Sequence, residues 1–127
     1  MGAFINISNH PSAQWTDEQR QAALTVRPGI DRIVDVPFPA VPPEADKNDI
    51  IRMAIDVIRE CPKDAVAIMV QGEHTLTARL VAQFLLFRPH IRCYAATSER
   101  RVIDHGDGRK TAEFRFVRFR EYSLPIP

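Results

Sequence analysis

The sequence predicts an α/β protein with a Rossmann-like, mainly parallel sheet, helices on both faces and a C-terminal β-hairpin. Apolar runs alternate with amphipathic helical patterns along the chain, as expected for parallel strands joined by crossover helices. Residues 65–70 are apolar without interruption, which is typical of a strand covered on both faces. Residues 104–108, with the sequence DHGDG, predict a hairpin turn between two further strand-like stretches.

The N-terminal segment is expected to form a strand, a polar loop and a helix. Residues 4–8 alternate apolar and polar side chains, as a strand does, and residues 8–12 form a polar loop that contains a proline. Thr16 is placed to cap the following helix, with Gln19 three positions later in a capping-box pattern. The Arg-Pro-Gly sequence at residues 27–29 predicts the end of that helix.

A second strand and a second helix are expected next. Residues 32–36 read as a strand, and the proline-rich residues 37–43 predict an extended connection. From Asp46 the pattern is helical again and stops at Cys61-Pro62. The predicted apolar face of this helix consists of Ile50, Ile51, Ala54, Ile55 and Ile58.

The third strand, residues 65–70, is expected to lead directly into a third helix. The joining sequence QGEHT contains a glycine, polar side chains and Thr75, which is placed to cap the helix. A strand that enters a helix through such a turn presents N–H groups and the positive end of the helix dipole, which bind anions such as phosphate. The apolar stripe of the helix consists of Leu76, Leu80, Val81, Phe84 and Leu85.

The C-terminal part predicts a fourth strand at residues 92–97, a polar connection at 97–100, and the returning hairpin strand at 110–122. In that last strand Phe114 and Phe116 share one face, but continued alternation would place arginines on the same face. Either a bulge near Val117 resets the register, or the strand leaves the core for a polar, ligand-lined region.

Composition predicts one globular domain, residues 1–127, that is soluble and cytoplasmic. The N-terminus lacks the pattern of a signal peptide, and no apolar segment approaches the roughly 20 residues of a membrane span. Cys61 and Cys93 do not form a CxxC motif, so reduced core thiols are expected. The net charge of +1 hides an asymmetry, because residues 88–127 contain nine Lys/Arg and five Asp/Glu. This basic part either faces an anionic ligand or forms a solvated surface.

Common cofactor motifs are missing from the sequence. It contains neither GxGxxG nor GxxxxGK[ST], which argues against a dinucleotide cofactor and against a P-loop nucleotide triphosphatase. The four histidines lack the spacing of metal ligands, so no metal site and no cofactor are expected.

Polar clusters follow three predicted strands, at residues 8–10, 71–75 and 97–99. Since the carboxyl ends of parallel strands meet at one edge of a sheet, these clusters predict a ligand site there. His10 can transfer a proton at neutral pH, or it can simply bond to its own loop. Trp15 either stacks on a base or packs at the start of its helix. Arg118 and Arg120 either pair with phosphate or protect the sheet edge.

Four segments together resemble the small CARF-like accessory proteins of type III CRISPR systems, which include stand-alone ring nucleases and other cyclic oligoadenylate-binding families. These segments are SNHPS, QGEHTLT, ATSERRV and FRFVRFREY, and the last one is the most specific. The resemblance implies a homodimer that holds cyclic tetra-adenylate, with no membrane or duplex nucleic acid partner. It also implies metal-independent cleavage, in which a ribose 2′-hydroxyl of the ligand attacks the neighbouring phosphorus. A binder that sequesters the ligand, or a sensor that serves a separate effector, remains an alternative.

The resemblance also implies the residues of the site. Its candidate catalytic residues are His10, Ser8 and Glu73. The candidate ligand-binding residues are Asn9, Gln71, Gly72, His74, Thr75, Thr97, Ser98, Arg100, Arg118 and Arg120.

Overall fold

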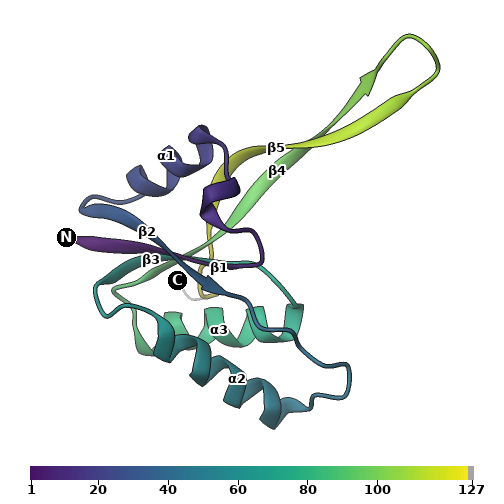
Figure 1. Cartoon of the computed structure of the whole chain (residues 1–127). Coiled ribbons are helices and arrows are strands. Elements are labelled where there is room, and N and C mark those ends of the chain that lie inside the picture. Colours follow the sequence, from purple (N-terminus) through teal and green to yellow (C-terminus); the bar gives the residue numbers. More distant parts are fainter. Residues whose placement is uncertain (126–127) are drawn as a thin grey trace.

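The computed structural model describes residues 1–125, which form a five-stranded sheet with helices on both faces (Figure 1). The strand order is β2-β1-β3-β4-β5; the first four strands are parallel, and β5 runs antiparallel to β4. This confirms the predicted fold class. The strands are β1 (Gly2–Ser8), β2 (Ile30–Pro37), β3 (Ala65–Val70), β4 (Arg92–Asp104) and β5 (Lys110–Glu121). The helices are the short 3₁₀ helix η1 (Ser12–Gln14), α1 (Asp17–Thr25), α2 (Lys47–Glu60) and α3 (His74–Phe87).

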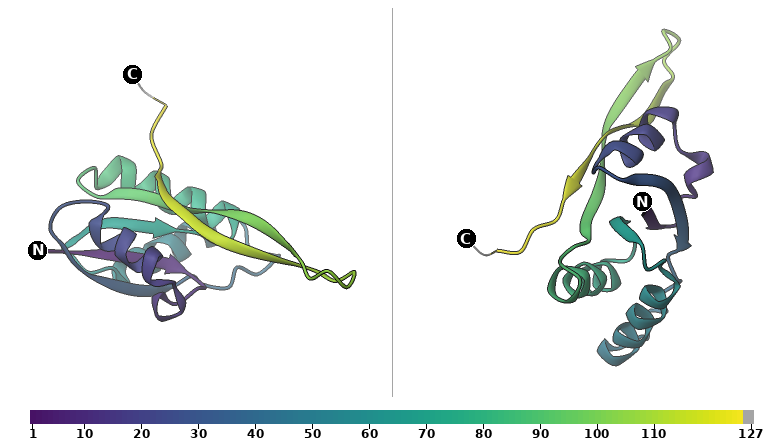
Figure 2. Two further views of the ribbon diagram at one scale, coloured as in Figure 1. Left: turned by 90° about the horizontal axis from the view of Figure 1, so that it is seen from above. Right: turned by 90° about the vertical axis from the view of Figure 1, so that its left-hand side faces the viewer.

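The helices divide between the two faces of the sheet. Figures 1 and 2 show α1 on one face and both α2 and α3 on the other. The chain leaves β1 toward β2 but leaves β3 toward β4, so the direction of winding reverses between the neighbouring strands β1 and β3. In open α/β sheets this reversal opens a crevice at the carboxyl ends of the strands, where ligands bind.

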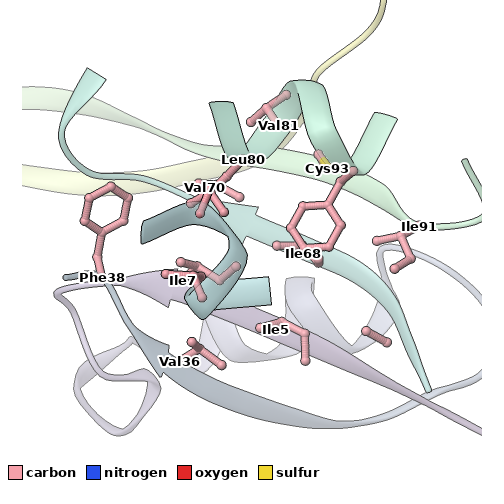
Figure 3. Close-up of a cluster of buried hydrophobic side chains, with 14 of the residues drawn as sticks. Ile5, Ile7, Val36, Phe38, Ile68, Val70, Leu80, Val81, Ile91 and Cys93 are labelled. Atoms are coloured by element: carbon pink, nitrogen blue, oxygen red, sulfur yellow. The ribbon is translucent and has the colours of Figure 1, made fainter. Parts of the chain in front are cut away.

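The larger hydrophobic core lies between the sheet and helices α2 and α3 (Figure 3). Strand β1 is buried along its whole length, as a central strand of a parallel sheet must be. The stripe predicted for α3 packs as expected, because Leu76, Leu80, Val81 and Phe84 are buried. The face predicted for α2 was partly wrong: Ile50 and Ala54 are buried, but Val57 is the third buried residue and Ile55 is exposed.

An aromatic cluster forms the smaller core, on the α1 face of the sheet. Phe4 of β1 lies with its ring centroid 5.1 Å from that of Phe119 and 6.3 Å from that of Trp15. The ring centroids of Phe116 and Phe119 lie 5.0 Å apart. Trp15 holds the start of α1 against the sheet, and the Thr16 hydroxyl caps that helix by accepting from the N–H of Gln19 at 3.2 Å, as predicted.

Strand β4 is longer than predicted. The expected connection at residues 97–100 was wrong, because β4 continues through these residues to Asp104 and pairs with β5 throughout. Polar side chains are compatible with a strand here, since this part of the ribbon is exposed.

The predicted bulge in β5 is confirmed at Val117. Thr97 pairs with Arg118 and the next residue, Ser98, pairs with Phe116, which leaves Val117 without a partner. Because of this extra residue, Phe116 and Phe119 can both pack in the aromatic cluster although they are three positions apart.

The hairpin beyond the bulge projects past the body of the molecule (Figures 1 and 2), and we call its residues 98–116 the arm. Gly106 and Gly108 have φ angles of 79° and 87° in its turn, a conformation that favours glycine.

Both cysteines are free, and Cys93 is fully buried. Burial raises the pKa of the Cys61 thiol to about 11 and that of Cys93 to about 12, which keeps both thiols protonated and unreactive near neutral pH. Within residues 1–125, no helix combines the length and the apolar character needed to cross a membrane.

Candidate functional site

A cleft of about 540 Å³ lies on the α1 side of the sheet, at the carboxyl ends of β1 and β3 and beside the middle of β4. It therefore occupies the place that the strand order predicts for a ligand. Its lining residues are Ser8, His10, Gln14, Trp15, Thr16, Gln19, Met69, Gln71, Ala96, Thr97, Ser98, Phe114 and Phe116. A depression of similar volume, about 580 Å³, is formed by α2 and the loop before it and includes no strand end.

The loop that carries His10 is held by a buried amide. Asn6, only 1% exposed, donates from Nδ2 to the backbone carbonyl of His10 at 2.8 Å and to Oδ1 of Asp35 at 2.9 Å. The Ser8 hydroxyl donates to Oδ1 of Asn6 at 2.7 Å, and the His10 N–H donates to Ser8 Oγ at 3.2 Å. Ser8 is thus engaged in fixing the backbone of His10, and this favours a positioning role over a nucleophilic one.

The same loop is also tied to β2. The N–H of Ser12 donates to Oδ1 of the Asp35 carboxylate and the Ser12 hydroxyl donates to Oδ2, both at 3.1 Å. Asn6 and Asp35 were missed from the sequence, because a polar residue in an alternating strand looks like a solvent-facing one. For Asn6 the signal is positional, since a polar residue in a strand with neighbours on both sides must find a hydrogen-bond partner. Asp35 is exposed on the edge strand β2 and gives no such signal.

The chemistry of the cleft is aromatic and amide-rich. Trp15 and Phe116 belong to the aromatic cluster and also line the cleft, and Phe114 stands at its outer rim. Gln71 bridges two strands, because its Oε1 accepts from the Ala96 N–H at 3.3 Å. Among the described residues that line the cleft, none has a carboxylate and His10 is the one histidine. Aromatic planes with amide donors and acceptors suit a nucleobase, which stacks on rings and hydrogen-bonds at its edge.

The turn before α3 differs from the prediction. Glu73, not Thr75, caps the helix: its carboxylate accepts from the N–H of Thr75 at 3.0 Å and from that of Leu76 at 2.8 Å. The Thr75 hydroxyl donates to the same carboxylate, and these hydrogen bonds hold the pKa of Glu73 below its ordinary value. The helix N–H groups that an anion would use are therefore already occupied by a side chain.

Close packing against Phe38 explains the glycine at position 72. A Cβ atom added there would lie 2.5 Å from the ring of the buried Phe38, so only glycine allows this close approach.

We expect Glu73→Gln to lower the melting temperature at pH 7, because the amide is a weaker cap than the charged carboxylate at the positive end of a helix. A carboxyl group with a lowered folded-state pKa stabilises the fold above its ordinary pKa of 4.5 and loses that contribution as the pH falls. The difference between the variant and the wild type should thus shrink below about pH 4.5. Thermal unfolding followed by circular dichroism measures it, and a difference that does not change with pH would contradict the charged cap.

The structure brings together only part of the predicted site. Ser8, His10, Gln71, Thr97 and Ser98 line the cleft. The other predicted residues do not line it. Asn9 lies in the loop after β1, Gly72 and Glu73 lie in the turn after β3, and His74 and Thr75 begin α3. Arg100 is on the arm, Arg118 lies near α1, and Arg120 is on the edge strand. The lining residues that were not predicted are Gln14, Thr16, Gln19, Phe114 and Phe116, and Trp15 was predicted only as one of two alternatives.

Within residues 1–125, no group of three or more His, Cys, Asp or Glu side chains is arranged to hold a metal ion. A protein-family model described as the uncharacterized protein MJ1673 family matches residues 2–120. No curated protein and no solved structure matches the chain.

Proposed function

This chain belongs to the uncharacterized protein MJ1673 family, and from its cleft we propose that it binds cyclic tetra-adenylate and cleaves it without a metal ion. The observation that carries the proposal is the aromatic, amide-lined cleft around His10 at the switch point of the sheet. Adenine can stack on Phe114, which is 73% exposed, and its edge can bond to the glutamine amides. In a cell, such an enzyme would switch off type III CRISPR signalling.

The proposed reaction needs only groups of the ligand and one protein base. The ribose 2′-oxygen attacks the adjacent phosphorus, its proton leaves, and the bond from phosphorus to the 5′-oxygen breaks. The products are a 2′,3′-cyclic phosphate and a 5′-hydroxyl. His10 transfers one of the two protons, either by accepting that of the 2′-hydroxyl or by protonating the 5′-oxygen, and solvent water transfers the other. The loop that holds His10 provides the positioning on which such intramolecular steps depend.

A ring with four-fold symmetry suits two copies of this small chain, so we propose that the functional unit is a homodimer in which both copies contact the ligand.

A non-catalytic binder of the same ligand is the second candidate. It is favoured by the presence of a single titratable side chain in the cleft, since acid–base cleavage commonly employs a pair. The engagement of Glu73 as a helix cap also favours the binder, because the carboxylate that was predicted to be catalytic is occupied by the N–H groups of α3.

One experiment separates these candidates. The protein is incubated with excess radiolabelled cyclic tetra-adenylate in EDTA, and the nucleotides are then separated by chromatography. Several turnovers to linear product would support the enzyme. Retention of intact ring would support the binder, and failure to retain or cleave the ligand would remove both.

Binding in this cleft can be tested with two matched glutamines of α1. We expect Gln19→Ala, in the cleft, to weaken affinity roughly fivefold through the loss of one hydrogen bond to the ligand. Gln21→Ala, two residues along the same helix and outside the cleft, should leave affinity unchanged. The emission of Trp15, the only tryptophan, measures binding. Equal effects of the two substitutions would place the ligand elsewhere.

A further inference from the structure

The arm carries an apolar surface that its own chain leaves uncovered. Phe114 and Val102 are 73% and 57% exposed. Directly opposed residues of an antiparallel ribbon share a face, and Ser98 and Phe116, which are such a pair, line the cleft. Alternation places three further pairs on this cleft-side face of the arm: Arg100 with Phe114, Val102 with Ala112, and Asp104 with Lys110.

The charged side chains on the two faces of the arm differ in whether they form ion pairs. On the opposite face, Arg101 pairs with Glu99 at 3.4 Å and Arg115 with Glu18 of α1 at 3.9 Å. On the cleft-side face, Arg100, Asp104 and Lys110 form no ion pair with any described residue of the chain. This face therefore presents an apolar centre with charges of both signs at its ends.

We propose that the cleft-side face of the arm docks on the same face of a second copy, with the two arms antiparallel about a two-fold axis near Val102. Such an axis places Arg100 over the partner's Asp104, and Val102 over the partner's Val102. On the neighbouring strand it places Phe114 over the partner's Lys110, a cation–π arrangement. The pattern is self-complementary, as a two-fold interface requires.

The balance of charge favours a protein partner over a polyanion. The arm contains five Lys/Arg and four Asp/Glu side chains, so a nucleic acid backbone would meet nearly as much repulsion as attraction. At about 3.3 Å per residue the contact is only about 20 Å long, so the dimer should be weak and concentration-dependent without a ligand.

The dimer also completes the cleft, and this part of the inference rests on the proposed function. In the antiparallel arrangement the partner's arm turn lies over Ser98 and Phe116, at the mouth of the cleft. Arg109 of the partner subunit is in that turn, where it pairs with the partner's Asp107 at 2.8 Å, and it brings a guanidinium to a cleft that has no Lys or Arg among its described lining residues. The phosphates of a bound nucleotide would meet guanidinium N–H donors from the second copy.

Sedimentation velocity over a range of protein concentrations tests the interface with two adjacent residues on opposite faces of the arm. We expect Val102→Asp to weaken the dimer at least tenfold, because two carboxylates would meet at the axis. Ile103→Asp, at a residue that is 39% exposed on the other face, should leave the dimer unchanged. A monomeric wild type, or equal weakening by both substitutions, would overturn the proposal.

A charge exchange gives a second test that does not depend on the stability of one variant. Arg100→Glu and Asp104→Lys should each form a weaker homodimer, because like charges then meet across the axis. Mixed in equal amounts, the two variants should form a heterodimer in which every pair is again opposite in sign. A mixture no more associated than either variant alone would also overturn the proposal. Since neither test uses a nucleotide, a dimer that binds no cyclic tetra-adenylate would contradict the proposed function and leave the arm interface standing.

Discussion

His10→Ala is expected to lower the single-turnover rate of cyclic tetra-adenylate cleavage by about 10²- to 10⁴-fold, the usual contribution of a positioned acid or base. The backbone of His10 is held by the Asn6 amide and the Ser8 hydroxyl, and its side chain lines the cleft. Affinity for the intact ring should stay within a few-fold of the wild type, because a contact made only in the transition state affects the rate and not ground-state binding.

The control for this prediction is His90→Ala. His90 is exposed and precedes β4, so it lies at the opposite end of the sheet from the cleft and should not affect the rate. Quenched-flow measurement with saturating enzyme gives the rate of the chemical step. An equal loss of rate and affinity in His10→Ala would make His10 a binding residue, and an unchanged rate would leave cleavage to the geometry of the ligand.

Phe4→Ala should have the largest effect on stability, about 3–5 kcal/mol of unfolding free energy, which is the usual cost of truncating a buried phenylalanine. Phe4 is fully buried in the interior strand β1 and packs against Trp15 and Phe119, so its loss opens a cavity between the sheet and α1. The total free energy of unfolding of most small domains is only about 5–15 kcal/mol. The variant should therefore unfold at a much lower urea concentration and lose the wall of the cleft.

Phe87→Ala is the matched control, because Phe87 is 74% exposed at the end of α3 and its truncation should change stability by less than about 0.5 kcal/mol. Urea unfolding is followed by far-ultraviolet circular dichroism, because the emission of Trp15 will itself respond to the loss of its neighbour. A destabilisation below about 1 kcal/mol for Phe4→Ala would show that α1 is not packed on β1 as the structure has it.

The positions of the strands and helices could be predicted because their signals are local. The uninterrupted apolar run of β3, the stripe of α3 and the cap of α1 are each contained in a few neighbouring residues. The break in alternation near Val117 was also visible, because a bulge shifts the apolar period by one residue. The buried face of α2 could not be predicted in full, because no local signal distinguishes Val57, which is buried, from Ile55, which is exposed.

The site was predicted only as far as it follows from strand ends. Ser8, His10, Gln71, Thr97 and Ser98 come together because parallel strands carry their carboxyl ends to one edge. Glu73 has the capping role that was predicted for Thr75, because either side chain could cap the helix and the geometry of the turn decides between them.

The sequence by itself determined the order of the elements, the class of fold and the edge of the sheet where polar side chains gather. Tertiary structure decided the walls of the cleft. Phe114 and Phe116 reach it from a strand more than a hundred residues after β1, and Asn6 finds Asp35 across 29 positions. Residue propensities and hydrophobic periodicity reflect only neighbouring residues in the sequence, whereas a cleft wall depends on which distant strands pair and in which register.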